Sequence, residues 1–299
     1  MLYFALPNFY ENFPVNSFLR DLSKSRPEVF KTKVSFYAMT GSIPYCSWSG
    51  GLNSNIGPGA YYNDLIELQR GASLPLRINM SNVLLEETDY HDNFADVILK
   101  IFDCGSNVIE ISSIPLMEVI EKKYPNYRFT FSKNADLITE FTPELIGSIL
   151  ELDQILTIGI PEKYSFDKEW LKNLPKKSKC EITVNPKCDC SICKNYDACL
   201  LQEHKHQIIY SGQQAMESCT KKNNLFDIEK MITIEDIEKT YSKMGFTRFT
   251  FTSNYAYDNN TLMKFYLGYF VKPEYHMDIY AQWENQMNEL MRRQQPYAM

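Results

Sequence analysis

Short apolar segments with polar ends recur along the chain, one roughly every 25 residues, which is the spacing of strands that alternate with helices. They are rich in β-branched and aromatic residues, a composition typical of buried strands. We identify seven good strands and one weaker eighth candidate. They are KVSFYAMTG (33–41), LRINMSN (76–82), NVIEISS (107–113), YRFTFSKN (127–134), DQILTIGI (153–160), CEITVNP (180–186), FTRFTFTSN (246–254) and the weaker HQIIYS (206–211).

Helical patterns lie between most of these strands. Apolar residues recur at helical spacing in each pattern, and Gly105 is placed to cap the end of one predicted helix. Thr142 and Pro143 are the residue types preferred at an N-cap and at the first helical position. The helical segments are 61–71, 93–105, 116–125, 142–152 and 234–245. This alternation predicts βαβ units and a parallel sheet, and therefore an α/β fold.

Three of the strands resemble one another. They carry Arg77, Arg128 and Arg248, each followed by alternating apolar residues and a hydroxyl near the strand end. Repeated strands with polar carboxyl ends are typical of a (βα)-barrel, where functional groups gather at those ends. Chance similarity within an open doubly wound sheet is the alternative, but the sequence has no glycine-rich nucleotide-binding loop. We predict a TIM-like, irregular (βα)-barrel.

The length fits one barrel domain followed by a helical tail. The chain has 299 residues, of which 44% are hydrophobic, and single α/β barrels reach about 250 residues. We assign residues 1–275, with a cysteine-rich loop at 186–220, to the barrel and residues 276–299 to the tail. The segment 277–294 has an apolar stripe that predicts a helix. The helix either packs on the barrel or contacts a second copy or a protein partner.

Composition and charge restrict the setting of the protein. No apolar stretch is long enough to cross a membrane, and the N-terminus lacks the features of a signal peptide. We therefore expect a cytoplasmic protein whose eight cysteines are metal ligands or buried thiols rather than disulfides. The net charge of −6 gives no general attraction to nucleic acid. The basic run at 172–179 is best explained as a solvated loop.

A cluster of cysteines is the most specific chemical signal. It follows directly after a predicted strand, so it is expected in a loop at the carboxyl edge of the barrel. Closely spaced thiolates bind either a tetrahedral zinc ion or an iron–sulfur cluster. We predict a metal site, with unliganded or oxidised thiols as the alternative. The cysteines are Cys188, Cys190, Cys193 and Cys199, with Cys219 further along the chain.

The remaining cysteines and two histidines are interpreted by position. Cys104 lies at a helix end and Cys180 opens a strand, so we expect both in the core, whereas Cys46 can face the site. His204 and His206 follow the cysteine cluster closely. Each is a fourth metal ligand, an acid–base residue or, most simply, a surface histidine.

A glycine-containing loop, SWSGGLNSNIGPG (47–59), follows the first of the predicted strands. Its backbone amides and the next helix can hold an anion, although a flexible loop with Trp48 over the barrel mouth is the simpler alternative. No serine nucleophile or carboxylate pair stands out, because most acidic residues lie on predicted helices. We expect a ligand site at the carboxyl ends of the strands. It comprises Trp48, Gly50, Gly51, Asn82, Lys133 and Asn185.

The order of strands, the step from VNPKC into the cysteine loop and the closing run at 244–275 resemble the collagenase-like peptidase family. That family includes proteins associated with prephenate-dependent hydroxylation of RNA and with hydroxylation of quinone precursors. The resemblance implies a barrel with a four-cysteine iron–sulfur cluster. The ligands it implies are Cys188, Cys193, Cys199 and Cys219.

A second resemblance is local. The run CDCSICKNY (188–196) is similar to the zinc motif of the tRNA-guanine transglycosylases, which are also barrels. Those enzymes need aspartates at strand ends, and no predicted strand here ends in one. We take this resemblance as support for a metal loop rather than for base exchange.

These features predict a metal-binding barrel enzyme with an iron–sulfur cluster that acts on a small-molecule or RNA-borne substrate by hydroxylation-type chemistry. A zinc-containing, transglycosylase-like enzyme is the first alternative. The second is a non-catalytic barrel whose metal loop is structural and whose surface binds a protein partner.

Overall fold

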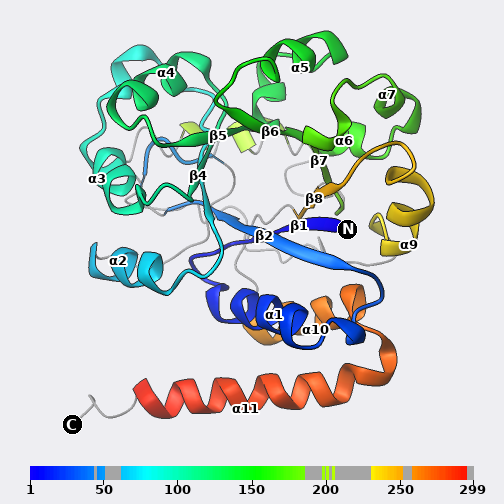
Figure 1. The fold of residues 1–299 in the computed structure, drawn as a ribbon. Coiled ribbons are helices and arrows are strands. Elements are labelled where there is room, and N and C mark those ends of the chain that lie inside the picture. The colour runs from blue at the N-terminus through cyan, green and yellow to red at the C-terminus, as the bar shows by residue number, and fades with distance from the viewer. Residues whose placement is uncertain are drawn as a thin grey trace.

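Eight parallel strands close into one barrel, in which each strand pairs with the next and the last pairs with the first (Figure 1). The structure is a computed structural model that describes residues 1–43, 46–50, 62–185, 197–198, 200–201, 204–205, 230–251 and 258–294. It confirms the predicted (βα)-barrel. The strands are β1 (Leu2–Pro7), β2 (Val34–Gly41), β3 (Leu76–Met80), β4 (Val108–Ile111), β5 (Arg128–Phe131), β6 (Ile155–Ile160), β7 (Cys180–Thr183) and β8 (Arg248–Thr250).

The eighth strand lies at the N-terminus, where the sequence pattern did not predict one. LYFALP, the sequence of β1, is almost continuously apolar, so it lacks the alternation that identifies a strand. It pairs with β2 and β8 and thereby closes the barrel. The weaker candidate at 206–211 lies outside the described residues, and the described strands close the barrel without it.

Helices surround the barrel and follow most of its strands (Figure 1). All five predicted helical segments contain helix, although 234–245 begins with one short α-helix and continues as a π-helical turn at Ile237–Tyr241. The α-helices are α1 (Phe13–Ser25), α2 (Tyr62–Gly71), α3 (Asn93–Phe102), α4 (Ile114–Lys123), α5 (Pro143–Ile149), α6 (Glu162–Ser165), α7 (Lys168–Lys172), α9 (Ile234–Asp236), α10 (Asn259–Phe270) and α11 (His276–Gln294).

Local sequence explains where these helices begin and end. The Thr142 hydroxyl accepts a hydrogen bond from the Leu145 N–H and caps α5, as the sequence predicts. The Asp92 carboxylate caps α3 in the same way. Gly105 has a φ of 75°, the left-handed conformation that glycine adopts without strain, and it follows the end of α3 by three residues.

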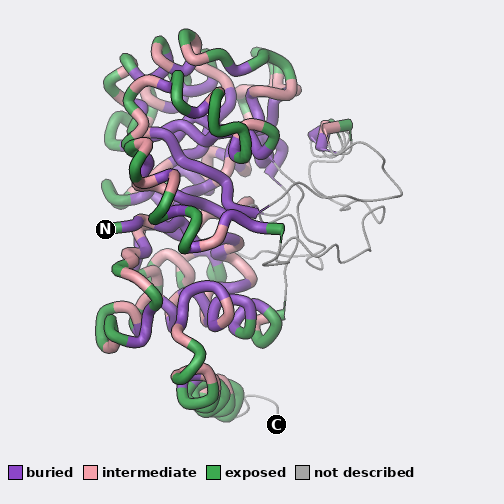
Figure 2. Tube along the Cα trace, turned by 90° about the vertical axis from the view of Figure 1, so that its right-hand side faces the viewer, coloured by how far each residue is buried: buried purple, intermediate pink, exposed green. Residues whose placement is uncertain are grey.

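The outer face of the barrel packs its apolar side chains against the helices. Figure 2 shows that buried residues are concentrated along the central part of the chain trace. The ring of Phe4 on β1 is completely buried, and its centroid lies 5.4 Å from that of Phe249 on β8. Phe270 of α10 meets the same ring edge-on at 4.9 Å. Burial of such aromatic side chains contributes about 1.5–3 kcal/mol each to folding.

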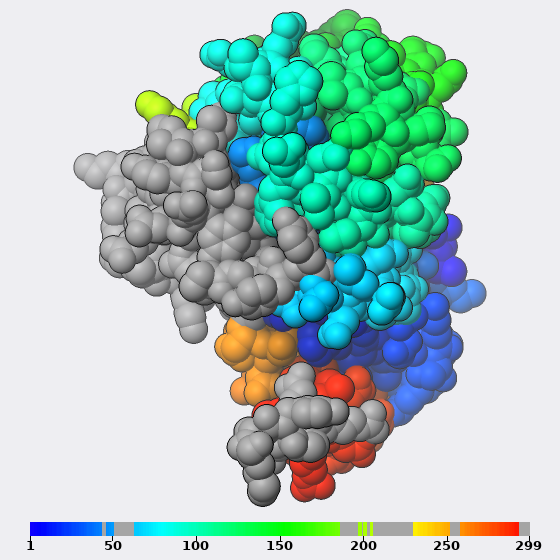
Figure 3. Space-filling model, turned by 90° about the vertical axis from the view of Figure 1, so that its left-hand side faces the viewer, coloured from blue at the N-terminus to red at the C-terminus, as the bar shows by residue number. Residues whose placement is uncertain are grey.

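Helix α11 forms an outer layer below α1 and α10 (Figures 1 and 3). Ile279 and Trp283 on its apolar stripe are fully buried. The Trp283 indole N–H donates to Asn260 Oδ1 at 2.9 Å, and its ring meets Phe18 of α1 at 5.4 Å. This part of the stripe therefore packs on the rest of the chain. Within the described residues, no helix has both the length and the apolar character needed to cross a membrane.

Candidate functional site

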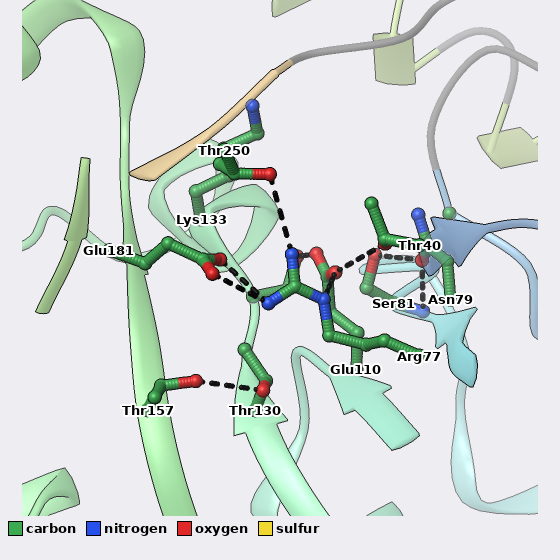
Figure 4. A network of polar contacts seen from close by, with 12 residues as sticks. Thr40, Arg77, Asn79, Ser81, Glu110, Thr130, Lys133, Thr157, Glu181 and Thr250 are labelled. Carbon is green, nitrogen blue, oxygen red and sulfur yellow. Dashed lines mark hydrogen bonds and ion pairs between the residues drawn. The ribbon is translucent and has the colours of Figure 1, made fainter. Parts of the chain in front are cut away.

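On several strands of the barrel the inward-facing positions are polar, whereas the outward-facing positions are apolar. On β3 the chain alternates between Arg77 and Asn79, which belong to the inner network of Figure 4, and the apolar Ile78 and Met80. The same alternation follows Arg128 and Arg248. The polar positions that these three strands share in sequence are therefore the ones that line the inside of the barrel.

An arginine lies at the centre of this lining, between two carboxylates (Figure 4). Arg77 Nη1 donates to both carboxylate oxygens of Glu181 on β7, at 2.7 and 2.9 Å. Its Nε lies 3.3 Å from Glu110 Oε2 on β4, and its Nη2 donates to Thr250 Oγ1 on β8 at 3.5 Å. Glu110 Oε1 accepts a hydrogen bond from the Ser132 hydroxyl at 2.7 Å. Four strands are therefore joined by one charged network.

The charges of this network are removed from water. The exposed fractions of the side chains are 3% for Arg77, 2% for Glu181 and 12% for Glu110. Burial raises the pKa of Glu181 to about 8, and the charge of Arg248 opposes this shift. Arg248 lies at the amino end of β8, where its guanidinium carbon is 4.9 Å from the ring centroid of Tyr37.

A lysine and a glutamate form a second charged pair at the carboxyl ends of the strands. Lys133, two residues after the end of β5, forms an ion pair with Glu162 at the start of α6, and its Nζ lies 3.4 Å from Thr183 Oγ1 on β7. The Lys133 side chain keeps 17% of its surface exposed, whereas Glu162 keeps 5%. The ammonium is thus held by buried oxygens and still reaches the surface of the mouth.

Asn82 joins the end of β3 to two other segments of the mouth. Its side-chain amide donates to the carbonyl oxygens of Ser47 at 2.8 Å and His204 at 2.9 Å. Its backbone N–H donates to the Trp48 carbonyl at 3.1 Å. The Trp48 indole N–H donates to the Asp89 carbonyl at 2.8 Å, so this ring anchors the 46–50 segment against the turn before α3.

His204 is a buried residue, which corrects its simplest interpretation as a surface histidine. The backbone N–H of Val83 donates to its Nδ1 at 3.3 Å, so the neutral ring carries its proton on Nε2. Burial also lowers the pKa of His204 to about 3. The Nδ1 lone pair accepts the Val83 N–H and is therefore not available to a metal ion in this arrangement. His206 lies outside the described residues.

Gly50 packs directly against the end of β3. A Cβ atom at this position would lie 2.2 Å from Ser81 Oγ and 2.6 Å from the Ser81 backbone, so only glycine fits. The Gly50 carbonyl accepts a hydrogen bond from the Ser42 hydroxyl at 2.8 Å. Ser81 Oγ also accepts from the Asn134 amide at 2.7 Å. The 46–50 segment, β3 and the end of β5 are thereby fixed together at the mouth.

The structure brings three of the predicted ligand-binding residues to one end of the barrel. Asn82, Lys133 and Asn185 each follow the carboxyl end of a strand, and Asn185 is fully buried. Trp48 and Gly50 reach the same end through their backbone contacts with β3. Gly51 lies outside the described residues, and binding of a ligand by this set stays a prediction.

The predicted metal ligands cannot be compared with the structure. All five lie outside the described residues. Within the described part of the chain, no group of three or more histidine, cysteine or acidic side chains is placed to hold a metal ion. Asn185, the last described residue of its segment, follows β7 at the mouth, and the cysteine run begins three residues later. The five are Cys188, Cys190, Cys193, Cys199 and Cys219.

The other three cysteines are described, and one of them differs from its prediction. Cys180 is buried in β7, as expected, and burial raises its pKa to about 12. Cys46 is also buried, with its pKa raised to about 12 by burial, so it stays a protonated thiol. Cys104 is exposed rather than in the core, because α3 ends at Phe102 and the chain turns outward before Gly105.

Sequence reasoning missed the carboxylates of the barrel interior. Glu110 and Glu181 are a pair held by one arginine, although no carboxylate pair was apparent from their positions along the chain. A signal was nevertheless present. Both glutamates lie inside predicted strands, at every-second-residue spacing from other polar residues, as in EIS and EIT.

No family model and no curated protein matches this chain. One solved structure, that of the U32 peptidase Mk0906, is similar over 84% of this chain and 91% of its own, with 11% sequence identity and a TM-score of 0.47. The U32 peptidases are the collagenase-like family that the sequence resembles.

Proposed function

We propose that this barrel is an enzyme that binds a small, oxygen-rich substrate at the carboxyl-terminal mouth, beside a cysteine-ligated metal centre. The observation that carries the proposal is the convergence of Asn82, Lys133 and Asn185 at one end of a barrel with a charged interior. The carboxyl ends of the strands are where active sites of this fold lie.

The cost of the charged interior supports a catalytic role. The centre of such a barrel is usually filled with branched aliphatic side chains, and a buried ion pair is often no more stable than apolar residues of similar volume. Here Arg77, Glu110 and Glu181 occupy that space instead. Departures from the packing rule of a fold are expected at functional sites.

The donors at the mouth favour a carboxylate or phosphate group on the substrate. An ammonium from Lys133 and amide groups from neighbouring asparagines donate hydrogen bonds to anionic oxygens, and Glu162 orients the ammonium. The basic run at 172–179 precedes β7, so it lies at the amino ends of the strands, away from the mouth. Its Lys172 and Lys176 form ion pairs with Glu169 and Glu151. This placement favours a small molecule over an RNA-borne substrate.

The metal centre that we propose is an iron–sulfur cluster held by the cysteine run. The donors are thiolates, which suit such a cluster or a zinc ion. The hydrogen bond from the Val83 N–H to His204 Nδ1 occupies one nitrogen of this histidine and favours an all-cysteine set. When bound, the cluster would supply one-electron transfer next to the mouth. The ligands proposed are Cys188, Cys193, Cys199 and Cys219.

Anaerobic purification followed by iron, sulfide and zinc analysis tests the metal centre. We expect iron with sulfide in the parent protein and loss of both in Cys188→Ser and Cys193→Ser. Cys104→Ser is the matched control, because that thiol is exposed on a distant turn, and it should keep the metal. Zinc without sulfide would favour the transglycosylase-like alternative. Absence of iron and zinc, with all three variants like the parent, would contradict a metal enzyme.

A thermal-shift screen with small carboxylates and phosphates tests the mouth. We expect at least one compound to raise the melting temperature of the parent and to have no effect on Lys133→Met. Lys163→Met is the control, since Lys163 lies beside Glu162 on α6 but pairs with Asp136 instead. An equal response of the two variants would place the ligand elsewhere.

A further inference from the structure

A cavity lies outside the barrel, between α3 and α4, which are neighbours on one side of the molecule (Figure 1). Its volume of about 340 Å³ is in the range of small-molecule sites. Leu99 of α3 and Ile120 of α4 contribute buried apolar side chains to its lining, and Val119 beside them keeps 39% of its surface exposed. Lys133 and Asn185 of the mouth do not line this cavity. Apolar surface is therefore available to a ligand at a second place on the molecule.

Three aromatic side chains also line the cavity, and the polar atom of each is engaged elsewhere. The indole N–H of Trp48 donates to a backbone carbonyl at 2.8 Å, and the Tyr90 hydroxyl lies 3.1 Å from Ser113 Oγ. The Tyr124 hydroxyl donates to Asp96 Oδ1 at 2.9 Å. What these residues offer to a ligand is therefore ring surface, which attracts organic cations.

The charge around the cavity is predominantly negative. The segment 86–96, which supplies part of the lining, contains no lysine or arginine and has acidic residues at Glu86, Glu87, Asp89, Asp92 and Asp96. The described lining sets the carboxylates of Asp92 and Asp96 against one ammonium, so with histidine neutral its net charge is −1. This balance favours a positively charged ligand over an anion.

The one lysine of the described lining, Lys123 at the end of α4, shows how the cavity holds a cation. Its ammonium forms an ion pair with Asp96 and lies 5.7 Å from the ring centroid of Tyr124. The exposed fractions of the two charged side chains are 59% for Lys123 and 38% for Asp96. Ion pairs that water reaches so easily are weak. A free ammonium can therefore take the place of this tethered one.

We propose that the cavity between α3 and α4 binds a small organic ammonium ion, with its charge beside Asp92 and Asp96 and its apolar body against the aromatic and aliphatic lining. Asp92 is held in place for this role, because its Oδ1 accepts the N–H groups of Phe94 and Ala95 and its Oδ2 accepts the Ser47 hydroxyl. A metal ion fits less well, since the described residues provide no group of three or more histidine, cysteine or acidic side chains to ligate one.

Isothermal titration calorimetry of the full chain with phenethylamine and phenethyl alcohol at pH 7 tests the site. The two probes have the same shape, but only the amine is charged. We expect phenethylamine to bind about tenfold more tightly or better, because hydrogen bonds between an ammonium and a carboxylate are about twice as strong as neutral ones. Equal affinities for the two probes, or no binding of the amine, would overturn the proposal.

Two variants of the lining should change the affinity for phenethylamine in opposite directions. Lys123→Ala removes the tethered competitor and should tighten binding by about two- to fivefold. Asp96→Asn removes a carboxylate and should weaken binding by about tenfold. Lys122→Ala is the matched control, because Lys122 is the exposed neighbour of Lys123 and does not line the cavity, and its affinity should equal that of the parent. Weaker binding to Lys123→Ala, or unchanged binding to Asp96→Asn, would contradict an ammonium site here.

The ammonium can belong to a free amine or to a lysine side chain of another protein, and a lysine blocked at both ends by acetyl and methylamide groups distinguishes the two. We expect the blocked lysine to bind more weakly than phenethylamine, because its body lacks a ring to pack against the aromatic lining. Tighter binding of the blocked lysine would assign the site to a lysine side chain instead. Failure of both compounds to bind the parent would exclude an ammonium ligand of either origin.

Discussion

The two faces of the barrel sheet differ in chemistry although they belong to the same strands. On β5, Phe129 and Phe131 point outward into the packed layer under the helices, whereas Thr130 and Ser132 point inward to the polar network. Burial of the outer face drives folding through the hydrophobic effect. The inner face holds charges that contribute little net stability. Stability and candidate chemistry are therefore separated on opposite sides of each strand.

The largest effect is expected on the outer face. Phe4→Ala removes a fully buried ring that meets Phe249, Phe251 and Phe270. The free energy of unfolding should fall by about 4 kcal/mol, because the lost apolar contacts leave a cavity. Urea denaturation at two pH values measures it, and the loss should be the same at both. A loss below about 1 kcal/mol would show that the outer layer repacks freely.

A smaller but still large effect is expected from Arg77→Met. The variant leaves Glu110 and Glu181 without their cation, so the free energy of unfolding should fall by about 3 kcal/mol. Arg128→Met is the matched control, since Arg128 occupies a similar place at the start of β5 but is exposed. It should change stability by about 0.5 kcal/mol or less. Equal losses of unfolding free energy in Arg77→Met and Arg128→Met, measured by urea denaturation, would mean that Arg77 does not stabilise the two interior carboxylates.

Much of this two-faced barrel could be predicted from the sequence. Seven strands and five helical segments between them follow from apolar periodicity, and the cap at Thr142 follows from residue type. Helices α1, α6 and α7 also lie between strands and were not predicted. The strand β1 could not, because a continuous apolar run fits a buried strand and a buried helix segment equally well. The closure of the barrel depends on this one strand.

The site was harder to predict than the fold. Asn82, Lys133 and Asn185 could be placed at one mouth, because parallel strands of a barrel end on the same side. The contact between Arg77 and Glu181 could not, since the two residues are 104 positions apart and meet only across the closed barrel. Local periodicity shows which positions face inward, but not which of them touch.

An intermediate effect is expected where the inner face reaches the mouth. Ser132→Ala removes the hydroxyl that donates to Glu110 and accepts from the Asn134 N–H, so two buried groups lose a partner. The free energy of unfolding should fall by about 1–3 kcal/mol. Ser148→Ala, on the exposed side of α5, is the control and should be nearly neutral. If Ser132→Ala leaves the free energy of unfolding unchanged in urea denaturation, Ser132 does not couple the charged cluster to the mouth.

The smallest effect, and the sharpest comparison of the two faces, comes from an inner hydroxyl pair. Thr130 and Thr157 bond to each other at 2.8 Å and are almost completely buried. Thr130→Val or Thr157→Val alone keeps the shape but leaves one buried hydroxyl without its partner, and each should lower the free energy of unfolding by about 1 kcal/mol.

The double variant Thr130→Val/Thr157→Val removes both hydroxyls together and should be within about 0.5 kcal/mol of the parent, because no unpaired polar group is left. A double-mutant cycle in urea denaturation measures the difference. Losses that simply add would give a coupling energy of zero and would mean that the two hydroxyls contribute to stability independently of each other. A double variant with an unchanged free energy of unfolding would mean that the interior accepts apolar side chains at no cost in stability. The polar lining around Arg77 would then have to be explained by what it does for the mouth rather than by folding.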